Sequence, residues 1–452
     1  MHLNAEGAEY ASRWAIEDLI KKYSNHIAFP IFLSYQKSEH DEKGKETSKV
    51  LTTEQVNSAA ALWKRPKNEL KDEDYKEFYK TVAHDMEDPL FWTHTRAEGT
   101  IEYTTLFFIP KKAPFDMLYA EFKPGVKLFV RRVFITDDDK ELLPTWLRFI
   151  RGVIDSEDLP LNVSREILQQ NKVMMKIRHD SVKKLLGEFE KLAQEKPDVY
   201  REFIAEYNRP LKEGLYSDYS HREQLTDLVR FKSTKADGWT SFAEYKERMK
   251  PEQKAIYFIT GDDEGKLRAS PLLEAYNKKD IEVLIMHDKV DEVIIPSLHK
   301  YKDLELRAVN RSDAGEDLKD SDDKEKEKNT LPVAEKIKKA LGDKVKDVRI
   351  SVRLSDSPSC VVTDQADPTY QMQALMRQMG RGKEVPEVKP ILEINPDHPI
   401  VVGLKDVENA EKIEDVSVLL LDQALLLEGV ELKDTPGFVK RLNRVLGRGL
   451  LS

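Results

Sequence analysis

The pattern of hydrophobic and polar positions predicts a mixture of helices and strands along the first part of the chain. Apolar residues at helical spacing predict helices over residues 13–23 and 70–85, and β-rich runs predict strands over residues 26–33, 101–109 and 126–135. The charged stretch 39–49 indicates a solvated hairpin or loop. A longer helical stripe ends near residue 197 and contains Val182, Leu185, Leu186, Phe189 and Leu192. Strands among helices predict an α/β layer over residues 1–196.

Shorter apolar runs alternate with helical patterns between residues 255 and 309. Strands are predicted at 255–260, 281–287 and 304–309, with helices at 271–276 and 290–301 between them. This order predicts a small parallel sheet within residues 197–311. The turn after the first strand, residues 260–265, carries acidic residues where a phosphate would need glycine N–H groups, and no G-x-G-x-x-G or Walker lysine motif occurs. We interpret this layer as structural.

The composition changes at residues 312–330, which are acidic, then mixed in charge, and almost free of apolar side chains. Such a stretch predicts a charged linker. A helix at 331–341 and a strand at 345–354 then open a C-terminal domain, residues 331–452. The predicted fold class is therefore α/β in the broad α+β sense, with two α/β layers joined by helices and a mixed α/β domain that ends in a helix pair.

The chain ends in two short amphipathic helical patterns separated by Gly429 and Pro436. Such helices hide their apolar stripes either against the rest of the chain or against a second copy, and a two-fold bundle of four helices is the simplest solution. The candidate dimerisation residues are Val416, Leu419, Leu420 and Leu427 on the first stripe and Phe438, Leu442, Val445 and Leu446 on the second.

A methionine-rich stripe precedes that helix pair. Met372, Leu375, Met376 and Met379 share one face of a predicted helix over residues 369–379. A stripe at this spacing is usually core, but methionine is flexible and polarizable and also suits surfaces whose partners vary. Both interpretations stay open.

Aromatic residues stand out at two further places. Trp63 is expected to be a packed aromatic. The segment 111–125 mixes lysines and two prolines with aromatic and aliphatic side chains, among them Phe115 and Leu118. A loop of this kind cannot bury its aromatic rings within itself, so these side chains either pack back on the sheet or contact a partner.

Composition narrows the class of protein. Charged residues make up 34% of the 452 residues, and the net charge of −9 argues against a general nucleic-acid binder, whose affinity would rest on neutralising phosphates. No apolar run approaches the roughly 20 residues that span a bilayer, and the N-terminus lacks signal-peptide features. The single cysteine, Cys360, excludes an internal disulfide framework and is expected to be a buried thiol. The histidines show no metal-binding spacing. We expect a cytoplasmic protein without a metal site.

The candidate for chemistry is Arg165. Ser164 is an N-cap residue type ahead of a long helical pattern, so Arg165 falls in the first helical turn. Helix N-termini carry partial positive charge, and a cation there needs a nearby anion. A bound phosphate would supply one. The alternative is a surface arginine paired with Glu157 or Glu166.

Several segments, taken in order, resemble one family. The run from Leu159 to Asn171 is similar to the catalytic loop of the heat-shock protein 90 chaperones, and further similar segments cover essentially the whole chain: 75–80, 113–116, 130–135, 148–154, 349–354 and 393–398. The similarity is greatest to the bacterial, high-temperature protein G type, because no acidic co-chaperone-binding tail follows Ser452. The resemblance implies the middle and C-terminal domains of such a chaperone, without its N-terminal ATP-binding domain.

The resemblance also implies a division of chemistry. ATP and magnesium would bind to the N-terminal nucleotide domain, so this chain alone would not be an enzyme and would hold no cofactor. Arg165 would reach the γ-phosphate when the domains dock, Gln169 would support that contact, and Asn162 would shape the loop. An arginine in this role offsets negative charge that develops on the phosphoryl oxygens.

Partners follow from the same resemblance. Partly folded client proteins are expected to contact Phe115, Leu118, Met372, Leu375, Met376 and Met379, with Trp63 as a further candidate. The family forms homodimers through the C-terminal helices, and a seventy-kilodalton heat-shock chaperone is expected to dock on the middle domain. The expected function is chaperoning in protein folding and the stress response. A nucleotide-independent holdase or scaffold is the alternative, and an enzyme that uses the 255–309 layer is a third possibility that would require nucleotide binding to this chain.

Overall fold

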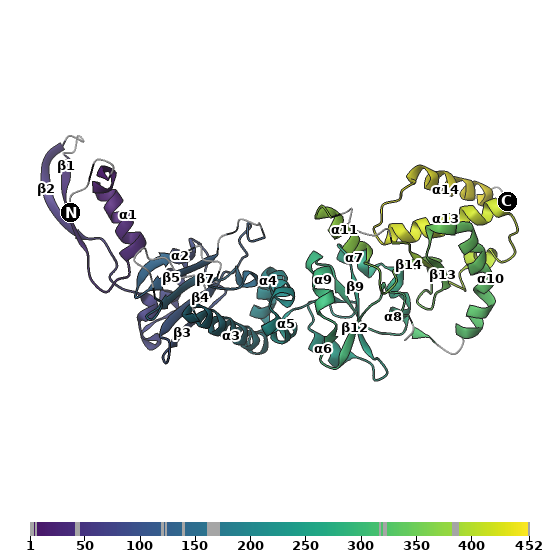
Figure 1. The fold of residues 1–452 in the computed structure, drawn as a ribbon, viewed down its shortest axis with the longest axis horizontal. Helices are drawn as coiled ribbons and strands as arrows, with labels where there is room; N and C mark the ends of the chain where they lie inside the picture. Colours follow the sequence, from purple (N-terminus) through teal and green to yellow (C-terminus); the bar gives the residue numbers. More distant parts are fainter. Residues whose placement is uncertain are drawn as a thin grey trace. The chain divides into compact units, whose positions relative to one another are not determined.

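The structure is a computed structural model that describes residues 4, 7–40, 46–118, 122, 124–137, 141–160, 172–315, 318–319, 323–381 and 388–450. The chain divides into two compact units, Met1–Leu211 and Lys212–Ser452. Both units contain helices and strands (Figure 1), which confirms the predicted α+β class.

The first unit is built around a five-stranded sheet with the strand order β3-β4-β7-β5-β6. Its strands are β3 (Phe91–Ala97), β4 (Tyr103–Ile109), β5 (Gly125–Val130), β6 (Val133–Thr136) and β7 (Arg151–Ser156). Strand β5 runs parallel to β7, and the other neighbours are antiparallel. An antiparallel hairpin of β1 (Phe32–His40) and β2 (Glu46–Gln55) precedes the sheet. The helices are α1 (Arg13–Ser24), α2 (Asp72–Ala83), α3 (Lys172–Glu195) and α4 (Pro197–Ser217).

Both faces of this sheet are covered. Helix α2 lies on one face, where Tyr79 and Phe108 belong to one buried cluster. Helices α3 and α4 lie on the other, where Phe149 contacts Phe189 and Phe203. The alternation over residues 101–109 indicates one buried face, but every residue of β4 is buried because helices cover the sheet on both sides.

The helices and strands predicted for the first unit agree only in part with the observed ones. Helix α1 begins at the predicted Arg13, and the hairpin interpretation of residues 39–49 is confirmed by the pairing of β1 with β2. The strand predicted over 26–33 is wrong for most of its length, since β1 begins only at Phe32. The run 126–135 contains two strands, which join through a tight turn at Arg131 and Arg132 with φ of 49° and 66°.

The second unit begins with a smaller sheet in the order β11-β12-β9-β10-β8. Its strands are β8 (Lys232–Ser233), β9 (Ala255–Thr260), β10 (Val283–Met286), β11 (Lys300–Tyr301) and β12 (Leu304–Ala308), and its helices are α5 (Arg222–Leu228), α6 (Phe242–Arg248), α7 (Glu264–Arg268), α8 (Glu274–Lys278) and α9 (Lys289–Ile294). The predicted parallel arrangement holds for β12, β9 and β10, while β11 and β8 are antiparallel edges. The helix predicted over 290–301 is wrong beyond Ile294, because a 3-10 turn at Ile295–Ser297 contains Pro296 and leads into β11.

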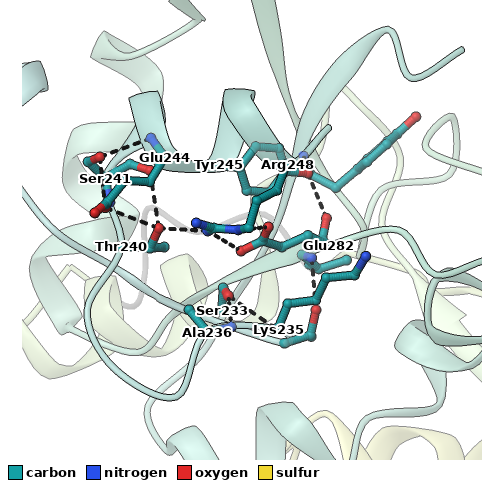
Figure 2. Close-up of polar contacts among 12 residues, drawn as sticks. Ser233, Lys235, Ala236, Thr240, Ser241, Glu244, Tyr245, Arg248 and Glu282 are labelled. Atoms are coloured by element: carbon teal, nitrogen blue, oxygen red, sulfur yellow. Dashed lines mark hydrogen bonds and ion pairs between the residues drawn. The ribbon is translucent and has the colours of Figure 1, made fainter. Parts of the chain in front are cut away.

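A polar network fixes α6 at the start of β10 (Figure 2). Arg248 forms two hydrogen bonds of 2.8 and 2.9 Å to the buried carboxylate of Glu282, and a third of 2.7 Å to the Thr240 hydroxyl. The Tyr245 hydroxyl donates to the backbone carbonyl of Glu282 at 2.6 Å. Arg248, Glu282, Thr240 and Tyr245 thus satisfy one another within the layer, which supports a structural interpretation of this network.

The C-terminal part of the second unit contains a three-stranded sheet in the order β13-β15-β14. Its elements are α10 (Asp323–Leu341), β13 (Asp347–Ile350), β14 (Ser359–Val362), α11 (Tyr370–Gln378), β15 (Ile391–Ile394), α12 (Pro399–Gly403), α13 (Ala410–Leu427) and α14 (Thr435–Leu450). Helix α10 begins at Asp323, inside the stretch that composition predicts as a linker, and its charged first turns are exposed.

One core joins the small sheet to the C-terminal sheet. Tyr257 from the small sheet and Cys360 and Ile391 from the C-terminal sheet belong to the same buried cluster. The opposite face of the C-terminal sheet packs against α10 and α13. The carboxylate of Glu274 adds a polar connection, because it accepts the backbone N–H groups of Ser355, Asp356 and Ser357 at 2.7, 2.9 and 3.1 Å. Burial acts to raise the pKa of Glu274, but these hydrogen bonds outweigh it and leave the pKa below its usual value.

Arg353 lies at the centre of this junction and is 1% exposed. Its guanidinium donates to the backbone carbonyls of Val309 and Arg311 at 2.6 and 3.2 Å, and it forms an ion pair of 2.9 Å with Glu393 on β15. Backbone carbonyls at the end of the small sheet and a carboxylate of the C-terminal sheet therefore bind the same buried guanidinium.

We expect Glu393→Gln to destabilise the second unit by about 3–5 kcal/mol, because it leaves the buried Arg353 charge without a counter-ion. Urea unfolding followed by circular dichroism measures the change. The matched control is Asp397→Asn, which removes the exposed partner of Lys326 and should leave the unfolding midpoint unchanged. Equal midpoints for the two variants would show that the buried pair contributes little.

Candidate functional site

The candidate catalytic residues belong to the segment that follows the C-terminal end of β7 in the chain. Arg165, Gln169 and Asn162 lie outside the described residues, which stop at Pro160 and resume at Lys172. The structure does describe both flanks of the segment, namely β7 with residues 157–160 on one side and the start of α3 on the other.

Asp155, the penultimate residue of β7, is fully buried and holds three groups together. Its carboxylate accepts the indole N–H of Trp63 at 2.8 Å and the backbone N–H of Arg132 at 3.1 Å. Lys64 lies 3.3 Å from the same carboxylate and 2.7 Å from Glu157. The three donors converge on this carboxylate and fix the end of the strand.

Residues 156–159 are tied down by further hydrogen bonds. The Ser156 hydroxyl accepts the N–H groups of Asp158 and Leu159 at 3.2 and 3.1 Å. The Asp158 carboxylate accepts the N–H of Glu102 at 2.6 Å, and the N–H of Glu157 donates to the carbonyl of Glu102 at 2.9 Å. The candidate segment therefore starts from a fixed backbone.

Sequence reasoning missed that Arg131 and Arg132 contact the described flank of this segment, at Glu157 and Asp155. Both have the left-handed φ that favours glycine or asparagine, a conformation that costs free energy for arginine. The Arg131 guanidinium donates to the carbonyl of Glu157 at 3.1 Å. No sequence signal marks this turn, because two-residue turns normally select glycine, asparagine or aspartate and two arginines stand here.

The described part of the segment 111–125 divides its apolar side chains between core and solvent. Met117 is buried, and its carbonyl accepts a 2.8 Å hydrogen bond from Arg148. Phe115 is 92% exposed, and Leu118 is also exposed. The base of the segment is held by Glu206 of α4, which accepts the N–H of Ala113 at 3.0 Å. Phe115 and Leu118 are thus presented outward from a fixed base.

The methionine stripe does not form a core. Helix α11 buries Gln373, while Met372, Leu375 and Met376 are only partly buried and Met379 is 66% exposed. Gln373 donates to the carbonyl of Pro368 at 3.2 Å, so a polar residue anchors the helix. The surface interpretation of the stripe agrees with this placement.

Ion pairs join the two C-terminal helices, α13 and α14, along one side. Arg444 of α14 contacts Asp415 of α13 at 3.1 Å, and Arg448 contacts Glu411 at 3.4 Å. The apolar face of α14 stays open, and its exposed side chains are Val439, Leu442 and Leu446. Phe438 and Val445 are partly buried on the same helix. On α13, Leu427 is exposed, Val416 and Leu419 are partly buried, and Leu420 belongs to the buried core.

Comparison with known proteins identifies the family. The sequence model of the family described as Hsp90 protein matches residues 37–451. The chain is 61% identical over 454 residues to the chaperone protein HtpG of Treponema denticola, covering 99% of this chain and 71% of that protein. It is 56% identical to the HtpG of Treponema pallidum and 52% identical to that of Wolinella succinogenes, and these matches cover 99% and 100% of this chain and 71% and 72% of the relatives. The chain belongs to the Hsp90 family.

The resemblance seen in the sequence motifs is therefore confirmed at the level of the family. Two predicted residues of the Hsp90 chain lie inside the core: Trp63, which is 1% exposed, and Leu420. The packed-aromatic interpretation of Trp63 is confirmed, and a client contact through its buried ring is not available in this structure. Leu420 likewise faces the chain's own core, where a second copy cannot reach it.

The remaining candidate reactive group of the Hsp90 chain, Cys360, has a structural place in the core. Cys360 is buried, and burial raises the pKa of its thiol well above the usual value, so it is an unreactive thiol. Within the described ranges, histidine, cysteine and acidic side chains form no group of three that could hold a metal ion. No described helix is long and apolar enough to cross a membrane.

We expect Trp63→Phe to lower the free energy of unfolding by about 1–3 kcal/mol, because Asp155 loses a buried hydrogen-bond donor. Suppression of client aggregation should stay unchanged, since the ring is buried. Urea unfolding and light scattering of an aggregating client measure the two effects. Trp14→Phe is the control, because Trp14 is 69% exposed and should change neither. A loss of client protection with unchanged stability would instead assign Trp63 a binding role.

Proposed function

We propose that this chain is the client-binding and dimerising part of a chaperone that assists protein folding under stress. The observation that carries the proposal is the 61% identity, over 99% of the chain, to a chaperone protein HtpG. The longer relatives would add the ATP site with its magnesium ion. On the same basis we propose a cytoplasmic location and a seventy-kilodalton heat-shock chaperone as a partner.

The exposed face of α14 supports dimerisation. Leu442 and Leu446 lie one turn apart on α14, and ion pairs of Arg444 and Arg448 join the other side of this helix to α13. Apolar surface in water costs about 25 cal/mol per Å², so this stripe favours a partner that covers it. A second copy presents the same stripe across a two-fold axis, and the four helices then form a bundle.

Replacing Leu446 by Glu should convert the dimer to a monomer, because a two-fold axis brings the charge and its copy into the same apolar interface. Sedimentation equilibrium measures the mass. Lys440→Glu on the same helix changes the net charge more than Leu446→Glu does. Because Lys440 lies at an exposed polar position, this control should leave the dimer intact. A dimer that survives Leu446→Glu would place the contact elsewhere.

Two separate client contacts are proposed, one formed by Phe115 and Leu118 on the first unit and one formed by the α11 stripe on the second. Phe115 stands outward from a loop whose base is hydrogen-bonded to Glu206. On α11, Met372, Leu375, Met376 and Met379 offer flexible side chains that adapt to varied apolar segments. Exposed apolar groups on fixed supports suit the recognition of partly folded proteins.

Arg165 is proposed to supply positive charge to ATP hydrolysis in the longer protein, with Gln169 and Asn162 as supporting residues. The support comes from the described flank, where Asp155, Ser156 and Asp158 fix the backbone that leads into the segment. A catalytic arginine needs such a support, because small displacements from its working position reduce the rate strongly.

In the protein with the relatives' full length, we expect Arg165→Ala to lower the rate of ATP hydrolysis by about 10³-fold or more while ATP binding is retained. Steady-state turnover and a nucleotide-binding titration separate the two properties. Lys176→Ala on the exposed side of α3 is the control and should leave turnover unchanged. Equal turnover in the Arg165 variant and the unaltered protein would remove this role.

A nucleotide-independent holdase is the second candidate, and the exposure of Phe115 and Met379 favours it because these surfaces are available without nucleotide. Suppression of client aggregation by this chain without ATP distinguishes the two. Protection that does not change when the remaining part of the relatives and ATP are added would favour the holdase.

A further inference from the structure

A cavity of about 1310 Å³ lies in the second unit, bordered by α11, α13 and the segment that leads to α14. Its apolar wall includes Leu421 and Leu425 of α13, and Tyr370 of α11 packs against the same core cluster as Leu425. None of the described lining residues is a histidine.

Glu428, the C-cap residue of α13, faces this cavity. A helix C-terminus carries partial negative charge, so a carboxylate there is electrostatically unfavourable. Burial raises the pKa of Glu428 to about 7, while the neighbouring Gln371 amide acts in the opposite direction. In the part of the chain that the structure describes, no ion pair reaches this carboxyl group.

Two polar atoms at the same wall lack partners among the described residues. The Tyr370 hydroxyl and the Gln371 side-chain oxygen are buried and form no hydrogen bond with other described residues. Both residues line the cavity with Glu428. Buried polar groups are normally hydrogen-bonded, so these two oxygens, beside a carboxyl group whose one donor among the described residues is the Gln371 amide, indicate a missing donor.

Two of the cations on the wall are engaged elsewhere. Lys389 pairs with Asp343 at 3.2 Å, and Arg441 lies 3.6 Å from Asp434 and also lowers the pKa of Asp422, which burial raises. The other buried carboxyl on the wall, Glu292, accepts the Thr369 hydroxyl at 2.8 Å. Glu428 differs from these acids because no described residue supplies it with a cation or a hydroxyl donor.

The geometry points to a binding site in which Glu428, Gln371 and Tyr370 hold a guanidinium or primary ammonium group on an alkyl stem. A guanidinium carries five N–H donors, which satisfy a carboxylate, an amide oxygen and a phenol oxygen together. Leu425 and Leu421 lie on the same face of α13 as Glu428, at i−3 and i−7, and can pack against methylene groups. The ligand is either a free amine or a basic side chain of a polypeptide.

The proposed cation site does not depend on ATP or on the role of Arg165. Its test can therefore succeed or fail independently of the proposed function. Its ligand binds the carboxylate form of Glu428. Because the neutral form dominates below pH 7, affinity should rise by about tenfold between pH 6 and pH 8. Of the other titratable groups on the wall, Tyr370 stays neutral throughout this range, since burial raises its pKa further.

Isothermal titration of the whole chain with agmatine, and separately with a short peptide that contains arginine or citrulline at one position, tests the inference. We expect saturable binding of agmatine, of the arginine peptide, or of both, and the pattern identifies the source of the cation. Glu428→Gln should weaken binding at pH 8 by tenfold or more. This variant should fold, since the native group is itself neutral below pH 7.

Asp422→Asn is the matched control, because it removes another partly buried carboxyl of α13 on the same wall and should leave binding unchanged. Tyr370→Phe should weaken binding without changing its pH dependence. The inference is overturned if neither agmatine nor the arginine peptide binds, if citrulline binds as well as arginine, or if Glu428→Gln binds with unchanged affinity.

Discussion

A single buried cation holds the second unit together. The Arg353 guanidinium contacts two carbonyls at the end of the small sheet and a carboxylate on the C-terminal sheet, with almost no exposure to solvent. A charge in such a place is stable only when all its partners are present. The small α/β layer and the C-terminal sheet must therefore fold against each other, and the apolar cluster around Tyr257 and Ile391 adds to the same junction.

This junction matters for function because the proposed working surfaces of the second unit depend on it. Helix α11 carries the methionine stripe, and α13 and α14 carry the dimer face and one wall of the cavity. A rigid support would keep the proposed dimer contact and the proposed client-binding stripe at a constant separation. The first unit provides its own support, since Asp155 and Ser156 fix the backbone before the candidate catalytic segment.

Hydrophobic periodicity predicted the elements that have strong local patterns. Strand β9 has its predicted bounds, and the buried stripe of α3 contains the predicted leucines and phenylalanine. Contacts between distant parts could not be predicted, because the pairing of Arg353 with Glu393 has no local pattern. The same is true of Glu428, whose sequence context resembles any polar helix end. The open face of α14 was visible as an amphipathic stripe, and Trp63 was predicted as a packed aromatic, whereas the burial of Leu420 depends on tertiary packing.

Native-state hydrogen exchange tests the cooperativity of the second unit most directly. If residues 212–450 fold around Arg353 as one body, the amides of β9 and β15 will exchange through the same global opening, with equal free energies and equal dependence on denaturant. If β9 and β15 open with clearly different free energies, the two sheets are separate cooperative bodies, and the support for a fixed geometry of α11, α13 and α14 is lost.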